Sequence, residues 1–479
     1  MPFKNLQEPI KMLAAKQQLV KIAEPVNPYL EIAEITDRVV KQNGPALLFQ
    51  NPTDSGFPVL TNLYGNLERI QAIFDIETLD DLGGRFARFL EMGPPKGWVE
   101  KLKLLPRLKE VANIFPKTVK RAPCQEIIIT ENPDLKTLPV LTCWPEDGGP
   151  FITLPVVITH HPKTGRRNLG MYRMQVYDER TAGLHWHVHK DGADHYRESA
   201  PGEPFPVAVA LGPDPVTTYC ATAPLPDGVD ELLLSGFLRQ KPVETVRCVT
   251  NDLEVPAESQ LVLEGYVNPG ELRSEGPFGD HTGYYSPADR YPVFHLTAIT
   301  HRKDPIYPAT IVGYPPMEDQ WLGKVTERLF LPLIKQQLPE IVDMNLPVEG
   351  CFHNLCFVSI KKRYPGHAHK VMQAIWGLGQ MMFTKMIFVF DQDVDVQDLS
   401  QVLFHLGGNV DPGRDITTVK GPVDALDHAS TLPHIGTKMG MDCTAKWPTE
   451  GYDRNWPKRI KMSPHIVQRI DDIWSRLGL

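Results

Sequence analysis

The chain has few of the features that mark proteins exported from the cytosol. Its 479 residues include seven cysteines, an odd number scattered along the chain, and only Cys351 and Cys356 lie close together. This usage indicates reduced thiols in the cytosol and argues against a disulfide framework. Residues 1–19 carry charges throughout and contain no apolar core, so neither a secretion signal nor a membrane span is expected. We therefore predict a cytoplasmic protein with at most peripheral membrane contact.

An excess of positive charge and the common cofactor-binding loops are also missing. The formal net charge is -8 and no basic stripe is present, which argues against a nucleic-acid partner. Neither G-x-x-x-x-G-K-[ST] nor G-x-G-x-x-G opens a helix after a strand, which excludes the commonest phosphate-binding loops. No C-x-x-C or H-E-x-x-H supports a zinc site, and no internal repeat or low-complexity tract occurs.

Length and patterning instead predict a mixed α/β (α+β) protein of three domains. The 42% hydrophobic and 23% charged content is ordinary for a globular chain, and 45 prolines favour loops and short strands. We expect an N-terminal α/β domain over residues 1–122, a β-rich split-barrel-like domain over 123–304, and a C-terminal α/β domain over 305–479. The last helix, at 464–477, follows a proline-rich extended run and is expected to contact a neighbouring subunit.

Periodicity and turn residues place the elements of these domains. Helices are expected at 28–43, 79–91, 95–105, 320–337, 366–382, 395–406 and 464–477. Strands are expected at 46–50, 125–129, 205–211, 243–248, 260–267, 293–299, 357–361 and 386–390.

The segment from Glu275 to Tyr285, E-G-P-F-G-D-H-T-G-Y-Y, places two carboxylates on either side of a bend. Gly276 and Gly279 allow backbone angles that other residues avoid, so Glu275 and Asp280 can face one cavity. Two neighbouring acids do not ionise independently, and a nearby cation decides which one holds the proton. A solvated surface turn is the alternative, but the aromatic residues at 278, 284 and 285 favour burial.

A second informative segment runs from Asn168 to residue 190. Residues 168–177 alternate and predict a strand, with 178–183 turning into a second strand that carries the histidines at 185, 187 and 189. Residues two apart share one face of a strand, so the three imidazoles would point together, as in a metal or anion site. Exposed or structurally satisfied histidines are the alternative. Arg173 can form a bidentate ion pair with a carboxylate.

Taken together, these segments resemble the UbiD decarboxylases, which include 3-polyprenyl-4-hydroxybenzoate decarboxylase and the ferulic acid decarboxylases. The likeness covers nearly the whole chain. It is carried by N-x-x-M-Y-R at 168–173, H-K-x-G-A at 189–193, N-D-L-E-V-P-A at 251–257, E-G-Y at 264–266, the segment 275–285, K-M-G-M-D at 438–442 and K-W-P at 446–448. One position separates the two types: Asp280 matches the hydroxybenzoate type, whereas ferulic-type members have glutamate.

The resemblance implies a prenylated FMN whose phosphate is held by a divalent ion, usually Mn2+, with a monovalent ion such as K+ nearby. Its implied metal ligands are Asn168, His189 and Glu231, although Glu231 alone reads equally as an acid at a helix start. The implied cofactor contacts are Asn168, Met171, Tyr172, Arg173, His185, Trp186, His187, Lys190, Asp191 and Lys385. The assignment of Lys385 is the weakest, since a lysine at a strand edge explains it equally.

The implied reaction is non-oxidative decarboxylation, in which the flavin accepts the electrons left by carbon dioxide. We expect Asp280 to deliver the replacing proton, with Arg173 and Glu275 setting its protonation state. The favoured substrate is 3-polyprenyl-4-hydroxybenzoate, which would give 2-polyprenylphenol for ubiquinone synthesis, with a simpler phenolic, acrylic or naphthoic acid as the alternative. A flavin prenyltransferase would supply the cofactor, and a homo-oligomer, dimer or hexamer, is expected. A metal-dependent hydrolase and a non-catalytic flavin-binding protein remain the alternatives from other classes.

Overall fold

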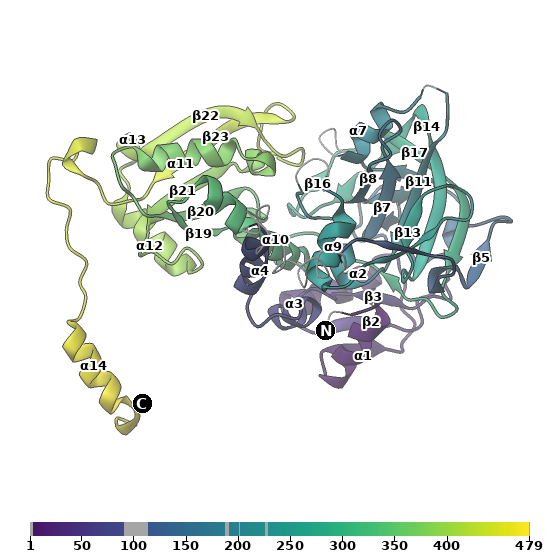
Figure 1. Cartoon of the computed structure of the whole chain (residues 1–479), viewed down its shortest axis with the longest axis horizontal. Helices are drawn as coiled ribbons and strands as arrows, with labels where there is room; N and C mark the ends of the chain where they lie inside the picture. The colour runs from purple at the N-terminus through teal and green to yellow at the C-terminus, as the bar shows by residue number, and fades with distance from the viewer. Residues whose placement is uncertain (1–2, 91–113, 187–190, 201, 226–228, 479) are drawn as a thin grey trace, which may run out of the picture.

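The computed structural model describes residues 3–90, 114–186, 191–200, 202–225 and 229–478. They form a mixed α/β structure, as the sequence predicts, with a C-terminal lobe beside a larger lobe that holds the rest of the chain (Figure 1). The predicted helix at 95–105 lies outside the described residues.

The N-terminal region builds a small four-stranded sheet with helices around it. Its elements are α1 (Gln7–Ala15), β1 (Leu19–Ile22), α2 (Glu31–Lys41), β2 (Ala46–Phe49), β3 (Val59–Thr61), α3 (Leu67–Phe74) and α4 (Asp80–Leu90). The order of the sheet is β1-β2-β3-β18, so its last strand, β18 (Tyr307–Pro308), comes from much later in the chain. There Tyr307 pairs with Val59 and Pro308 with Leu60, in parallel.

The central region is dominated by a nine-stranded sheet. Its strands are β5 (Ile127–Ile129), β6 (Phe151–Ile152), β7 (Pro155–His160), β8 (Arg167–Met171), β9 (Met174–Val176), β10 (Thr181–Leu184), β11 (Phe205–Leu211), β14 (Leu261–Glu275) and β17 (Asp289–His301). The order is β6-β9-β10-β17-β14-β11-β7-β8, with β5 on β17, so over the described residues the sheet stays open. Strand β11 lies between β7 and β14 and is buried on both faces except at Pro206, which explains its nearly continuous apolar run.

Smaller elements complete this region. They are β4 (Lys117–Val119), η1 (Pro123–Gln125), η2 (Leu135–Thr137), α7 (Asp191–Arg197), α8 (Pro215–Cys220), α9 (Glu231–Arg239), β12 (Glu244–Arg247), β13 (Glu254–Pro256), β15 (Phe278–Gly279) and β16 (Tyr285–Ser286). Strand β4 lies before residue 122, the predicted end of the N-terminal domain, but it pairs with β12 of the central region. Strand β15 pairs with β16.

Strands β14 and β17 are longer than the sequence predicts. The prediction ends the first strand at Val267, just before Asn268, Pro269 and Gly270, which are residue types typical of turns. The structure carries β14 through to Glu275, with the pairing to β17 shifted between Val267 and Leu272. The turn-forming residues are absorbed as an irregularity in one strand. As a result, Glu275 ends a long strand instead of lying in a free loop.

The C-terminal lobe has a five-stranded sheet in the order β19-β20-β21-β23-β22. Its elements are α10 (Asp319–Gln337), β19 (Ile341–Asn345), η3 (Val348–Gly350), β20 (Leu355–Ile360), α11 (His367–Trp376), η4 (Gly379–Phe383), β21 (Met386–Asp391), α12 (Leu399–Asn409), α13 (Pro412–Asp415), β22 (Ile416–Pro422), β23 (Ile435–Asp442) and η5 (Pro448–Glu450). The predicted helix 366–382 ends early, because Gly377 caps α11 and a separate turn, η4, follows.

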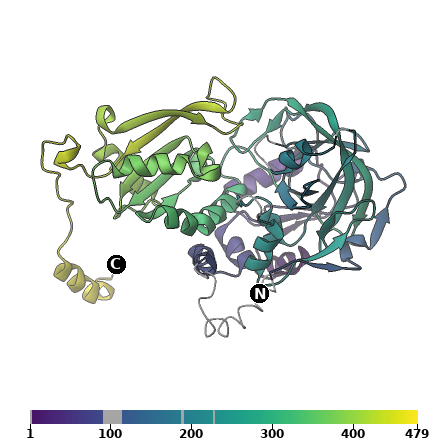
Figure 2. The same cartoon turned by 45° about the horizontal axis from the view of Figure 1, so that its top comes forward.

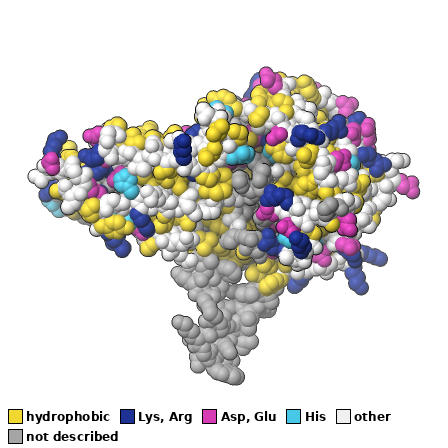
Figure 3. Space-filling model, turned by 90° about the horizontal axis from the view of Figure 1, so that it is seen from above, with side chains coloured by type: hydrophobic (Ala, Val, Ile, Leu, Met, Phe, Trp, Pro, Cys, Tyr) yellow, Lys and Arg dark blue, Asp and Glu magenta, His cyan; other side chains and the backbone are white. Residues whose placement is uncertain are grey.

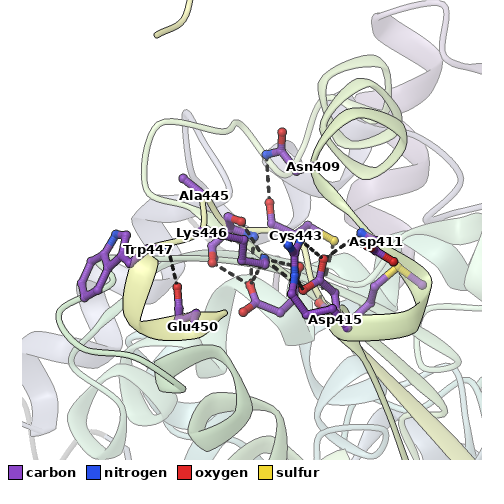
Figure 4. A network of polar contacts seen from close by, with 12 residues as sticks. Asn409, Asp411, Asp415, Cys443, Ala445, Lys446, Trp447 and Glu450 are labelled. Carbon is purple, nitrogen blue, oxygen red and sulfur yellow. Dashed lines mark hydrogen bonds and ion pairs between the residues drawn. The ribbon is translucent and has the colours of Figure 1, made fainter. Parts of the chain in front are cut away.

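Buried Lys446 fixes the segment that follows β23 (Figure 4). Its ammonium lies 3.1 Å from Asp442 Oδ1 and donates to the carbonyls of Asp442 and Thr444 at 2.7 Å each. Asp415 lies 3.7 Å away as a second counter-charge. Because a buried cation needs such partners, this network gives the K-W-P segment a structural role.

Beyond this network, the chain leaves the body as a terminal arm, which we define as residues 460–478 (Figures 1 and 2). The arm contains α14 (Pro464–Ile473) and η6 (Trp474–Arg476), and no residue of either is buried. At its base, Arg459 Nη1 lies 2.6 Å from Asp393 Oδ2, and Lys461 Nζ lies 3.8 Å from the same oxygen. Apolar side chains of the arm are exposed, among them Ile460, Met462 and Trp474.

On the face shown in Figure 3, basic and acidic side chains of the described residues are interspersed. This mixture agrees with the absence of a basic stripe from the sequence. Within the described parts of the chain, no helix combines the length and apolar character needed to cross a bilayer.

Candidate active site

Arg173 lies at a break in the predicted strand 168–177. Strand β8 ends at Met171 and β9 begins at Met174, so the prediction of one continuous strand is wrong. Strand β9 then forms an antiparallel hairpin with β10, as expected for this region. The break frees Tyr172 and Arg173 from the regular ladder, and the Arg173 side chain extends to the bent segment more than a hundred residues later.

The guanidinium of Arg173 joins both acids of that segment. Its Nε donates to Glu275 Oε1 at 2.9 Å, and its Nη1 forms an ion pair with Asp280 Oδ2. Its Nη2 donates to Ser286 Oγ at 3.1 Å. The ring of Phe278 packs against the guanidinium, with its centroid 4.4 Å from Cζ. A planar cation with several donors suits this arrangement better than a lysine would.

Glu275 is fully buried, at 0% exposure, and is held by two donors. His185 Nδ1 lies 2.8 Å from Glu275 Oε2, to which Arg173 Nη2 also donates at 3.4 Å. Burial alone would raise the pKa of Glu275, but the hydrogen bond from His185 and the charge of Arg173 hold it below its ordinary value. Burial lowers the pKa of His185, so this imidazole is neutral at pH 7 and donates from Nδ1.

The two glycines of the bend serve different purposes. Gly276 has a φ of +93°, which supports the sequence argument, and its N–H donates to Gln175 Oε1 at 2.8 Å. Gly279 is not in the left-handed region, so the conformational argument made for it from sequence is wrong. A Cβ at Gly279 would lie 2.1 Å from Trp144 Cδ1, so glycine is needed at this position because a side chain has no room. Asp147 accepts from the Gly279 N–H at 2.8 Å.

Asp280 follows β15 directly and is 6% exposed. Its Oδ1 accepts from the backbone N–H of His281 at 2.8 Å and lies 2.9 Å from His281 Nδ1. Burial would raise the pKa of Asp280, but His281 and Arg173 hold it well below its usual range. Without substrate, therefore, the proposed proton donor is ionised.

Of the histidines at 185, 187 and 189, the structure describes only His185, and it lies outside the predicted strand. Strand β10 ends at Leu184, before His185, and α7 begins at Asp191, so His185 is not on the expected second strand. His187, His189 and Lys190 lie outside the described residues. Trp186 is buried, and its ring centroid lies 5.5 Å from that of Tyr196.

Two of the three implied metal ligands are described, and they lie together. Glu231, the first residue of α9, is buried and accepts from the Leu169 N–H at 2.9 Å, so its carboxylate lies against β8. Asn168, the neighbouring residue of β8, is buried, and its side-chain Nδ2 has no hydrogen-bond partner among the described residues. No cluster of three His, Cys, Asp or Glu side chains suited to a metal occurs among the described residues.

Lys385 lies just before β21 and pairs with Asp427, at 2.8 Å between Nζ and Oδ1. It is absent from the described lining of the cavity at Arg173. Its contact with a cofactor stays a prediction.

One cavity adjoins Arg173, and a second cavity shares part of its lining. The first, of about 350 Å3, is lined by Tyr172, Arg173, His185, Phe278, Asp280 and His281 on one side and by Gln380, Met382 and Phe383 of η4 on the other. The second, of about 520 Å3, shares Thr153, Met171 and Val312 with the first and extends along α10 past Leu322, Phe330 and Ile334. The site therefore lies between the central sheet and the C-terminal lobe.

Sequence reasoning missed several residues of this site. Ser286 comes from β16 and His353 from the turn after η3, and neither belongs to a motif that the sequence singles out. His281 lies within the bent segment, next to an acid, which was the one available signal. His353 is 72 residues further along the chain, and only the packing of the two lobes brings it close.

A buried guanidinium between two carboxylates, at the wall of a cavity, is an arrangement that can bind an acid and move protons. Sequence comparison gives the family. The N-terminal, Rift-related and C-terminal domains of 3-octaprenyl-4-hydroxybenzoate carboxy-lyase match residues 10–86, 117–315 and 320–443. The chain belongs to this family, the UbiD family, and is a carboxy-lyase.

Three similar proteins show the extent of the likeness. An uncharacterized protein of Aquifex aeolicus is 52% identical over 481 residues, covering 100% of this chain and 99% of the relative. The vanillic acid decarboxylase of Sedimentibacter hydroxybenzoicus, in its closed form, has a TM-score of 0.88 at 27% identity and full coverage of both chains. An evolved dimeric form of HmfF from Pelotomaculum thermopropionicum, in complex with prFMN, has a TM-score of 0.78 at 28% identity, covering 97% of this chain and 98% of that one.

Proposed function

We propose that this enzyme decarboxylates an aromatic acid with prenylated FMN as its cofactor. The observation that carries the proposal is the position of Arg173, in contact with Glu275 and Asp280 at a cavity between the two lobes. The vanillic acid decarboxylase and the prFMN complex of HmfF, both similar over nearly the whole chain, support the substrate class and the cofactor.

The residues at β8 and α9 could hold a divalent metal ion that would bind the phosphate of the flavin. Buried Asn168 has a side-chain nitrogen without a hydrogen-bond partner among the described residues, and the buried carboxylate of Glu231 accepts from the N–H of the next residue, Leu169. The side-chain oxygens of both residues are the kind of ligand that Mn2+ prefers. His189 would complete the set, with K+ as a second ion. Met171 and Tyr172, which follow on the same stretch of chain, would then contact the ring system, leaving Arg173 beyond it at the reacting end.

The bound flavin would supply the electron sink for the breaking carbon–carbon bond. The chain's own residues would handle binding and the proton. A substrate carboxylate entering near Arg173 adds negative charge, which raises the pKa of Asp280 and favours its protonated form. Once carbon dioxide has left, Asp280 can give that proton to the substrate carbon that carried the carboxylate. Glu275, held by His185, keeps Arg173 fixed throughout.

We favour 3-polyprenyl-4-hydroxybenzoate as the substrate, with 2-polyprenylphenol as the product in ubiquinone synthesis. The 520 Å3 cavity supports a substrate with an apolar tail, because Leu322, Phe330 and Ile334 line it. A simpler phenolic acid is the second candidate, and the similarity to vanillic acid decarboxylase favours it. A prenylated acid would be collected at a membrane surface.

The test is to express the chain with a flavin prenyltransferase and assay a panel of aromatic acids for carbon dioxide release. We expect protein with a flavin absorption band that is active on para-hydroxylated benzoates. Activity that rises with prenyl chain length supports the tailed substrate, and activity confined to small phenolic acids supports the alternative. Colourless, flavin-free protein with full activity would overturn the proposal.

The terminal arm supports assembly into a homo-oligomer. Its apolar side chains Ile460, Met462 and Trp474 are not covered by any of the described residues, whereas a second copy could bury them. We propose that α14 packs on a neighbouring subunit.

A further inference from the structure

Asp280 is the first of a row of three titratable side chains that crosses between the two lobes. His281 Nδ1 lies 2.9 Å from Asp280 Oδ1, and His281 Nε2 lies 3.1 Å from His353 Nε2. Two facing imidazole nitrogens form a hydrogen bond only when one of them carries a proton. The row therefore always holds a proton between the two rings, immediately behind the acid assigned to the reaction.

The surroundings of His281 favour its cationic form. The Phe352 ring stacks on the imidazole at 5.4 Å between centroids, while the carboxylates of Asp280, Asp319 and Asp424 supply negative charge from three different segments. Burial works against the charge, but Asp280 outweighs it and raises the pKa of His281 to about 9.

His353 is the neutral partner of the pair. Burial and the charge of His281 lower the pKa of His353 to about 4, although Asp424, Asp427 and Asp280 oppose this shift. Neutral His353 can thus accept the hydrogen bond from His281 Nε2, and its own Nδ1 is buried without a hydrogen-bond partner among the described residues.

We propose that His281, supported by His353, is a positioning residue that reloads Asp280 with the proton consumed in each decarboxylation. The inference rests on the proposed function, in which Asp280 protonates the carbon that has lost carbon dioxide. It goes further by assigning a source for that proton, which Asp280, ionised in the resting site, does not itself hold.

The step balances in protons. The N–H bond at His281 Nδ1 breaks and an O–H bond forms on Asp280; that O–H then breaks as the new C–H bond forms on the product. The histidine pair is left with two protons on four ring nitrogens and regains its third from solvent. Each carbon dioxide released thus costs one solvent proton, and no oxidant or reductant is needed.

The row exists only while the lobes are in contact. Asp280 and His281 belong to the bent segment of the central region, whereas His353 follows η3 in the C-terminal lobe. Reloading would therefore occur only when the C-terminal lobe covers the site, which keeps the proton for the bound substrate.

The first test needs neither cofactor nor substrate. Nuclear magnetic resonance of protein with 15N-labelled histidine gives the apparent pKa of His281, assigned by its loss in His281→Asn. We expect a value near 9 in the wild type, and below 7 in Asp280→Asn, which removes the main counter-charge. His353→Phe should lower the pKa of His281 by at least one pH unit, because the buried Nε2–H of His281 loses its acceptor. His369→Gln, whose imidazole Nδ1 lies 3.1 Å from Thr417 Oγ1 of β22 and does not belong to the row, is the matched control and should change nothing.

The second test follows carbon dioxide release by the holoenzyme against pH. We expect the wild-type kcat to fall above about pH 9, where His281 loses its proton, and His281→Asn to lose about tenfold to a hundredfold in kcat at pH 8 with little change in KM. In His353→Phe, kcat should begin to fall at a lower pH than in the wild type. The difference should equal the decrease in the His281 pKa measured by magnetic resonance.

Each outcome has a separate meaning. The proposal that His281 reprotonates Asp280 is overturned if wild-type His281 titrates near pH 6.5. It is also overturned if the His281→Asn enzyme keeps its kcat and pH profile. Loss of all activity in the wild-type holoenzyme on every aromatic acid would overturn the proposed function instead, and the titration would then still report whether the row exists. Should His281→Asn fail to fold, His353→Phe provides both readouts.

Discussion

Replacement of Arg173 by methionine would remove the cation and keep most of the side-chain volume. Glu275, at 0% exposure, and Asp280, at 6%, would then be two buried carboxylates near each other without the guanidinium. Breaking a buried ion pair in this way costs about 3–5 kcal/mol. We therefore expect the free energy of local opening of the segment 271–286 to decrease by that amount at pH 8.

Hydrogen exchange followed by mass spectrometry measures the opening of this segment directly. A change of about 3–5 kcal/mol corresponds to exchange faster by roughly two to nearly four orders of magnitude. The exposed Arg180, on the same hairpin, provides the matched control: Arg180→Met should change the local stability by less than about 0.5 kcal/mol.

The pH dependence gives a second check on Arg173. In the wild type, the pKa values of Glu275 and Asp280 are depressed, so their stabilising effect is present at pH 8 and is lost as pH falls through those values. Without Arg173, the pKa values of both acids rise from these depressed values, although His185 and His281 still oppose the rise. The two carboxylates of the variant therefore take up protons at a higher pH, which removes their repulsion on acidification. The gap between Arg173→Met and wild type should therefore shrink from pH 8 to pH 5. Equal exchange in the two proteins at pH 8 would refute the charge argument.

Three further predictions follow from the structure. Asp280→Asn should abolish carbon dioxide release while the flavin absorption of the holoenzyme is kept; a colourless protein would assign Asp280 a structural role. Gly279→Ala should lower both activity and melting temperature, because its Cβ would lie 2.1 Å from the Trp144 ring, whereas Gly56→Ala, with nothing within 4 Å, should be neutral in the same assays. Deletion of residues 460–479 should leave the far-ultraviolet circular dichroism per residue nearly unchanged but reduce the mass measured by light scattering to that of one chain; an unchanged oligomer would contradict the role of the arm.

Much of the framework follows from local pattern. The bounds of β11 and α10 were predicted nearly to the residue. Burial of a strand on both faces gives a continuous apolar run, and burial of a helix on one face gives a periodic apolar pattern, so both can be recognised in the sequence. The two acids of the bend and Arg173 were found through motifs. What local pattern does not contain is pairing between distant segments, such as the contact of His281 with His353. The continuation of β14 through Asn268-Pro269-Gly270 was missed for the same reason, since only the neighbouring strand β17 keeps those residues in the sheet.

The pairing of Leu60 with Pro308 has a consequence for biosynthesis. The ribosome makes the first three strands of the N-terminal sheet early, yet the fourth emerges 248 residues later, after the whole nine-stranded sheet has been translated. Until then, β3 offers a bare edge on which other nascent chains could pair. Expression of the N-terminal region as a separate fragment would make that exposure permanent, so useful truncations should retain residues 307 and 308.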